Sequence, residues 1–222
     1  MNIFVESVSL DEIRHAWSAG FADGVVFGDA AIAGDEPGGA SGHELLESIA
    51  LEFAIPICVE VGAIDGADMY RAARELAKVS DHVVIQLPLV EDAIGPMHRL
   101  SQEGVGVCAT FVSNGAQAVL AAKAGASIVR VSLHDLDSQG QTSADAVREI
   151  RSLLESSACE CDVMVASPGN TTQFTECIAA GAQIVSIRPS VLQSLLLHPL
   201  TDRGVDRFLN SLSRRSRPRD DR

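Results

Sequence analysis

Charged side chains that could transfer a proton or hold an anion lie near the ends of short apolar runs. Glu6 and Glu60 each stand near the end of such a run, and Arg130 lies within another. A strand of a parallel sheet is covered on both sides, so each charge must be paired or must reach solvent. Two interpretations remain open. Glu60 and Arg130 form a structural ion pair, or Arg130 holds a substrate anion while Glu6 or Glu60 transfers a proton.

Residues 82–88 contain a run of apolar residues that leads to a polar side chain, Gln86, and then to Leu87 and a proline. The run of β-branched residues predicts a buried strand whose carboxyl end presents this amide. An amide can donate and accept hydrogen bonds, but its nitrogen lone pair is delocalised. Gln86 is therefore a candidate site residue that cannot form an iminium with a ketone.

Other polar side chains stand at or just after the ends of predicted strands, and they divide into two groups. The candidate catalytic residues are Glu6, Glu60, Gln86, Thr110 and Ser132. The candidate substrate-binding residues are Asp29, Arg130, His134, Asp135, Ser167, Asn170 and Arg188. His134 lies in a predicted loop, where it could be a general acid or base or simply be exposed. Asp29, His134, Asp135 and Asp137 could gather a metal, but their spacing matches no specific motif, so we predict no metal and no cofactor.

Short apolar strands alternate with helices of about a dozen residues, eight times along the chain. The predicted strands are residues 3–5, 24–27, 55–61, 82–88, 105–111, 127–133, 161–166 and 184–187. The predicted helices are residues 9–19, 43–53, 65–78, 91–103, 114–124, 142–155 and 170–180, and a last helix follows His198-Pro199 and runs to 213. Such alternation requires a parallel sheet with helical crossovers. Eight units predict a closed (β/α)₈ TIM barrel with an additional C-terminal helix, and an open doubly wound sheet is the alternative.

In a (β/α)₈ barrel the carboxyl ends of all eight strands meet at one face, which would bring the candidate residues together. Residues 1–213 are expected to form a single domain, and residues 214–222 a disordered basic tail. Residues 34–41 are rich in glycine, proline and acidic residues and predict a mobile loop. Gly104, Gly125 and Gly181 are expected to end helices just before a strand.

The composition limits the kind of partner. The chain has 222 residues, a net charge of −13 and a pI of about 4.8, which argue against nucleic acid or an anionic membrane as the main partner. No apolar run is long enough to span a bilayer, and no signal peptide is apparent. The five scattered cysteines lack the spacing of a disulfide framework and favour reduced thiols in the cytoplasm.

Three stretches resemble the small transaldolases of the fructose-6-phosphate aldolase-like branch. They are HVVIQLPLVEDAIGPMHRLSQEGVGVCATFV, AAKAGASIVRVSLHDLDSQG and HPLTDRGVDRFLNSL. The resemblance covers nearly the whole chain and implies a (β/α)₈ barrel that cleaves or forms carbon–carbon bonds. It also implies a homo-oligomer, a ring of five subunits or a decamer, in which residues 201–213 reach over a neighbouring subunit.

The resemblance also implies a Schiff-base lysine at the end of the fourth strand, where this chain has Gln86. The chain has only two lysines, Lys78 and Lys123, and both are expected on helices facing solvent. Other positions differ from the family as well. The family has an aspartate where this chain has Glu6, a threonine and an asparagine where it has Val26 and Gly28, and a glutamine where it has Glu60. The family's water-holding tyrosine is replaced by Ser132, its phosphate-binding arginine by Asp135, and a basic residue of the family falls near Gly169. Thr110 and Ser167 match the family. An unmodified transaldolase mechanism is therefore not expected.

Three hypotheses follow. The chain is an enzyme that acts on a sugar-like, keto or aldehyde compound by carboxylate acid–base chemistry, with any anionic group bound by Arg130 or Arg188. Alternatively, it is a non-catalytic homologue that binds a small molecule or serves as a scaffold. The third hypothesis is a metal-assisted lyase that uses the acidic residues at the mouth of the barrel.

Overall fold

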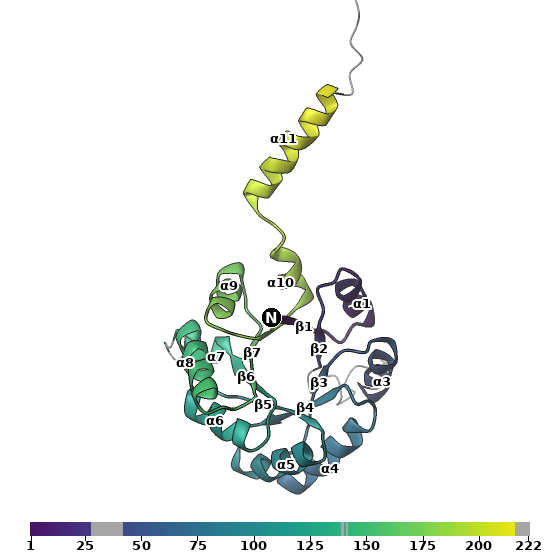
Figure 1. The fold of residues 1–222 in the computed structure, drawn as a ribbon. Coiled ribbons are helices and arrows are strands. Elements are labelled where there is room, and N and C mark those ends of the chain that lie inside the picture. Colours follow the sequence, from purple (N-terminus) through teal and green to yellow (C-terminus); the bar gives the residue numbers. More distant parts are fainter. Residues whose placement is uncertain (28–41, 139, 141, 216–222) are drawn as a thin grey trace, which may run out of the picture.

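Eight parallel strands close into a barrel surrounded by helices, which confirms the predicted (β/α)₈ TIM barrel (Figure 1). The computed structural model describes residues 1–27, 42–138, 140 and 142–215, and side chains up to Leu212. Each strand pairs with the next in sequence, and β1 pairs with β8 to close the barrel. The strands are β1 (Asn2–Glu6), β2 (Gly24–Phe27), β3 (Ile57–Glu60), β4 (Val83–Pro88), β5 (Gly106–Thr110), β6 (Ile128–Ser132), β7 (Asp162–Ala166) and β8 (Ile184–Ile187).

The helices cover the outside of the barrel, except for the last one. They are α1 (Leu10–Ser18), α3 (Gly42–Glu52), α4 (Gly66–Ala77), α5 (Glu91–Gln102), α6 (Gly115–Lys123), α7 (Leu133–Ser138), α8 (Ser143–Ser156), α9 (Thr171–Ala179), α10 (Pro189–Ser194) and α11 (Pro199–Arg215). Each covering helix buries one apolar face against the strands, as α8 does with Val147, Ile150 and Leu154. Within the described part of the chain, no helix is both long and apolar enough to cross a bilayer.

Helix starts follow the sequence signals closely. Ser9, Asp65, Asn114 and Asn170 are N-caps, and each side chain accepts a hydrogen bond from a backbone N–H in the first turn. The three predicted terminator glycines all have positive φ, for example +102° at Gly125, where a side chain would be strained.

Some predicted boundaries were wrong. Residues 133–138, predicted as a strand end and a loop, form the short helix α7, so His134 lies on a helix. A second short helix, α10, follows β8 with Pro189 at its first position. The last helix continues to Arg215, two residues into the segment predicted as a disordered tail. The predicted loop 34–41 and Asp29 lie outside the described residues.

The two faces of each strand have different roles because side chains alternate along it. The outward-facing residues form the main core with the helices. The inward-facing residues form a separate apolar layer inside the barrel, which consists of Phe4, Val26, Cys58, Val84, Cys108, Ile128, Met164 and Ile184. Two residues further along several strands the inward positions become polar. We call this set the polar layer: Glu6, Glu60, Gln86, Thr110, Arg130 and Ser186.

Helix α11 extends away from the barrel in Figure 1. Its apolar side chains lie in solvent, with Leu200 62% and Phe208 61% exposed. Isolated helices of this length gain little stability from propensity alone, so an amphipathic helix usually needs a surface to pack on.

Candidate active site

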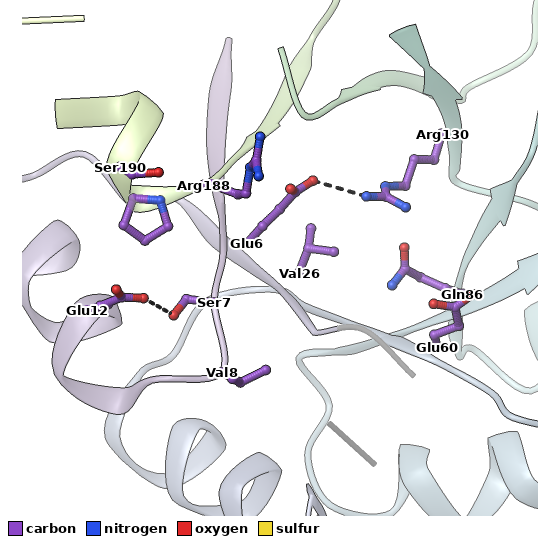
Figure 2. A pocket seen from close by; sticks show the side chains of 11 residues that line it. Glu6, Ser7, Val8, Glu12, Val26, Glu60, Gln86, Arg130, Arg188 and Ser190 are labelled. Atoms are coloured by element: carbon purple, nitrogen blue, oxygen red, sulfur yellow. Dashed lines mark hydrogen bonds and ion pairs between the residues drawn. The ribbon is translucent and has the colours of Figure 1, made fainter. Parts of the chain in front are cut away.

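A cavity of about 570 Å³ opens at the carboxyl ends of the strands, above the polar layer (Figure 2). Its floor and walls include Glu6, Val26, Glu60, Gln86 and Arg130 from the barrel interior. Its rim includes Ser7, Val8 and Glu12 near the start of α1, and Arg188, Pro189 and Ser190 at the start of α10. Polar groups at the mouth of a (β/α)₈ barrel are where ligands and catalysis are found in this fold.

Glu6 and Arg130 form an ion pair across the barrel interior. Nη2 of Arg130 donates to Oε1 of Glu6 at 3.0 Å, and only 24% of the Arg130 side chain and 15% of the Glu6 side chain are exposed. The predicted ion pair between Glu60 and Arg130 was therefore wrong. β1 and β6 are three strands apart in the closed barrel, with β7 and β8 between them, and closure brings together two residues that are 124 positions apart.

Two serine hydroxyls complete the coordination of the Glu6 carboxylate. Ser186 donates to Oε1 at 2.6 Å, and Ser167 donates to Oε2. Ser167 directly follows β7 and has φ of +50°, an uncommon conformation for a residue with a side chain. With three donors on its two oxygens, Glu6 has most of its acceptor capacity occupied inside the barrel.

Glu60 is in a different situation. It is partly exposed in the cavity, and the structure gives it no hydrogen bond or ion pair among the described residues. Its neighbour in register on β4 is Gln86, and Figure 2 shows the two side chains next to each other on the cavity wall. Of the two candidate carboxylates in the barrel interior, Glu60 is the one free to exchange a proton with a ligand.

Three buried polar atoms in or beside the polar layer have no hydrogen-bond partner among the described residues. They are Oε1 of Gln86, Oγ1 of Thr110 and Nε of Arg130. Gln86 is only 1% exposed. Leaving such a group unpaired costs about 1–3 kcal/mol, so buried polar groups normally have a partner. Gln86 and Arg130 also line the cavity, so this part of its wall has hydrogen-bonding capacity that the described residues leave unused.

Arg188 is the second guanidinium of the cavity. It precedes α10 at the mouth, its side chain is exposed, and the described residues include no acidic partner for it. Because Arg130 is already paired with Glu6, Arg188 is the better placed of the two predicted anion-binding arginines.

Several predicted site residues lie away from the cavity walls. Ser132 accepts a long hydrogen bond, 3.4 Å, from the Asp135 backbone N–H, and His134 and Asp135 are exposed on α7. Asn170 caps α9 by accepting from the Gln173 backbone N–H. The structure does not gather these four residues with Glu6 and Glu60.

Three of the four residues that were considered as metal ligands, His134, Asp135 and Asp137, lie on α7. Asp137 accepts hydrogen bonds from Ser143 and Gln173, and no three His, Cys, Asp or Glu side chains cluster within the described ranges. Asp29 is not among the described residues.

Sequence reasoning missed Ser186, Ser7 and Glu12. Ser7 donates to Glu12 at 2.5 Å on the cavity rim, and Ser186 anchors Glu6. The period of two along residues 184–188 was a usable signal, because it puts Ile184, Ser186 and Arg188 on one face of the chain. No comparable signal marks Ser7.

Both lysines lie on the outer helices, as predicted. Lys78 is the C-cap of α4 and forms an ion pair with Glu75, and Lys123 is exposed at the end of α6. Since these are the only lysines of the chain, no lysine amine reaches the cavity.

The barrel interior also holds two thiols. Cys58 and Cys108 are fully buried below the polar layer, and burial raises the pKa of Cys58 to about 12, an effect that the charge of Arg130 partly opposes. Burial likewise raises the pKa of Cys161 to about 12 and that of Cys177 to about 11.

These raised pKa values predict a selective thiol reaction. A raised thiol pKa leaves little nucleophilic thiolate below pH 9, and burial also excludes the reagent. We expect only the partly exposed Cys159 to react with a disulfide reagent at pH 8, and all five cysteines to react after unfolding in guanidinium chloride. The folded Cys159→Ser variant should then show no rapid reaction of its remaining thiols. Rapid reaction of that variant would contradict the burial of the other four.

A closed (β/α)₈ barrel with polar side chains at the carboxyl ends of its strands is an architecture that many enzymes share. Residues 40–218 match the model of the family Transaldolase/Fructose-6-phosphate aldolase. A probable transaldolase of Thermodesulfovibrio yellowstonii is 36% identical over 211 residues, which cover 94% of this chain and 96% of that protein. Probable transaldolases of Petrotoga mobilis and Bartonella tribocorum are 34% and 33% identical, over 95% of this chain in both cases and over 94% and 95% of those proteins.

The chain therefore belongs to the transaldolase/fructose-6-phosphate aldolase family. The family model begins after β2, so it covers β3 to β8 and α11, including Glu60, Gln86, Thr110, Arg130 and Ser186, whereas Glu6 on β1 lies outside it.

Proposed function

We propose that this chain binds a small hydroxycarbonyl compound, such as a hydroxyketone or hydroxyaldehyde, and forms or cleaves a carbon–carbon bond in it by acid–base chemistry without an imine. The observation that carries the proposal is the pairing of Glu60 with Gln86 in register at the cavity wall. One side chain is a carboxylate without a partner among the described residues, and the other is an amide with a buried oxygen that lacks one.

The positions of the amines support a reaction without an imine. Gln86 stands where the resemblance places the Schiff-base lysine, and both lysines of the chain lie on the outer helices. A carboxylate can instead remove a proton from the carbon next to a carbonyl group, provided that the oxyanion is stabilised. Glu60 serves as this base, and Arg188 at the mouth binds an anionic group of the substrate where one is present.

The direct test is a carbon–carbon bond assay. Native protein is incubated with dihydroxyacetone and glyceraldehyde, and the products are followed by nuclear magnetic resonance. We expect Glu60→Gln to lower kcat about 10²–10⁴-fold, the usual contribution of a general base. Glu75→Gln is the matched control, because Glu75 is an exposed carboxylate of α4 that pairs with Lys78. Equal turnover by native protein and Glu60→Gln contradicts the assignment of the base.

A second candidate function is ligand binding without turnover. The amide at Gln86 favours it, since the same buried polar groups can hold a ligand without any chemistry. Dihydroxyacetone that raises the melting temperature but yields no product in the assay above would support binding alone.

We also propose that the chain forms a homo-oligomer in which α11 docks on another subunit, in a ring of five or a decamer. The support is the apolar stripe of α11, where Leu200, Val205 and Phe208 are all exposed. A stripe of this kind on an extended helix marks an interaction surface.

Truncation of α11 tests the oligomer. We expect a chain that ends at Leu197 to sediment as a monomer, and Phe208→Asp to weaken association, because a charge placed in an apolar interface is costly. Asn210→Asp on the same helix is the control, since it adds a charge at a polar position. A ring that survives removal of α11 contradicts this docking mode.

A reducing compartment such as the cytoplasm is the location that we propose. All five cysteines are free thiols, and four of them are buried. Oxidising compartments favour proteins whose thiols are paired in disulfides.

A further inference from the structure

Arg130 carries a positive charge into the barrel interior. It lies on the inward face of β6, one step above Ile128 of the apolar layer. Figure 2 shows its guanidinium facing Glu6 on one side and lying above Gln86. The Nη2 group is used by Glu6, whereas the buried Nε–H has no acceptor among the described residues.

The orientation of this guanidinium is set by groups from three other strands or their ends. Glu6 on β1 holds Nη2, and Glu6 is itself held by Ser186 on β8 and by Ser167 after β7. Ser186 is completely buried, so its hydroxyl cannot turn to solvent. A charge fixed in this way needs little reorganisation when a negative charge develops beside it. Glu6 and Ser186 are positioning residues in this arrangement.

The three unpartnered atoms form a complementary set. The Arg130 Nε–H is a donor, the Gln86 Oε1 is an acceptor, and the Thr110 hydroxyl can be either. They come from adjacent strands, and Gln86 and Thr110 are both more than nine-tenths buried. Of the three side chains, Gln86 and Arg130 line the cavity, and a hydroxycarbonyl compound matches them in kind, because its carbonyl oxygen accepts and its hydroxyl group donates.

We propose that Arg130 is the electron sink of the site, the group that stabilises the enediolate of a hydroxycarbonyl substrate in place of an iminium. This proposal rests on the function proposed above and adds a catalytic role for Arg130, whose guanidinium lines the cavity and binds the reacting oxygen. The guanidinium of Arg130 is always charged, is 24% exposed, and is the cation of the polar layer. Arg188 lies at the exposed mouth instead.

The reaction balances without an external oxidant or reductant. The Glu60 carboxylate takes a proton from the carbon next to the carbonyl group, and the electron pair of that C–H bond forms the carbon–carbon double bond. The carbonyl π electrons move to the oxygen, which Arg130 stabilises. The enediolate carbon then attacks the carbonyl carbon of an aldehyde, a carbon–carbon bond forms, and the new alkoxide takes the proton back from Glu60. Cleavage is the reverse sequence.

Hydrogen exchange isolates the first step. Native protein is incubated with dihydroxyacetone in D₂O, and exchange of the carbon-bound hydrogens is followed by nuclear magnetic resonance. We expect Arg130→Ala to lower kcat for exchange about 10²–10³-fold, the usual loss of an oxyanion donor, with a much smaller change in KM. Added guanidinium ions are expected to restore part of the rate, which a purely structural role of Arg130 does not predict.

Two further variants keep the test decisive. Glu6→Gln with Arg130→Met removes both charges together, so a fold lost in Arg130→Ala is recovered and the fall in kcat should persist. Arg148→Met is the control, because Arg148 is an exposed arginine on α8. Exchange by native protein with an unchanged kcat in the Arg130 variants overturns the role of Arg130 and leaves the proposed function standing. Native protein that catalyses neither exchange nor bond formation overturns both.

Discussion

Glu6→Gln is expected to lower the free energy of unfolding by about 3 kcal/mol, because it leaves the guanidinium of Arg130 largely buried without its counter-charge. Removing one partner of a buried pair costs far more than the pair contributes in net terms, since the remaining charge is still desolvated. The two serine hydroxyls that now donate to the carboxylate would also meet a poorer acceptor. Unfolding in urea, followed by circular dichroism, measures this loss.

Two further variants show whether the loss of stability comes from the burial of the remaining charge. Glu52→Gln also removes a carboxylate that pairs with an arginine, Arg14, but on the surface, where we expect a much smaller change because solvent screens both charges. Glu6→Gln combined with Arg130→Met removes both charges and should recover most of the lost stability. If Glu6→Gln and Glu52→Gln have the same effect, then the ion pair across the barrel does not behave as a buried one.

Gln86→Lys protein is expected to form an imine with a ketone, and borohydride should reduce this imine to a stable covalent adduct. With dihydroxyacetone and borohydride, native protein should gain no covalent adduct, since the cavity holds no lysine amine. The new lysine would sit at a position that is 1% exposed and close to Arg130. Burial and a neighbouring positive charge both lower the pKa of a lysine, and the neutral amine is the form that attacks a carbonyl group. Mass spectrometry of the intact chain measures the adduct.

The matched control for that variant is Gln102→Lys, which places the same side chain on the exposed end of α5. Its amine should stay protonated and untrapped under the same conditions. An adduct on native protein would contradict the proposal that the site works without an imine. A folded Gln86→Lys protein that forms no adduct would show that Gln86 does not stand where a Schiff-base lysine could act.

The amino-acid sequence was sufficient to predict the barrel, because the signals for it are local. Strand runs such as 82–88, caps such as Asp65 and Asn114, and terminators such as Gly125 each depend on residues only a few positions apart. The short helices α7 and α10 were missed because six residues carry too little periodicity to distinguish a helix from a loop. Family membership was also predictable from three stretches of sequence, and the relatives confirm it.

The period of two along each strand also predicts which side chains face the interior, and so it places Glu6, Glu60, Gln86 and Arg130 at the mouth. It does not say which of them meet. Arg130 pairs with Glu6 on β1 and not with Glu60 on β3, and Ser186 joins the pair from β8. Only the closed barrel decides this. β1 and β3 both lie three strands from β6, and closure brings the hydroxyls of Ser167 and Ser186 onto the carboxylate of Glu6, which Arg130 meets. In the same closed barrel Glu60 has no partner among the described residues. Glu6 is therefore the carboxylate that holds Arg130, and Glu60 is the candidate base.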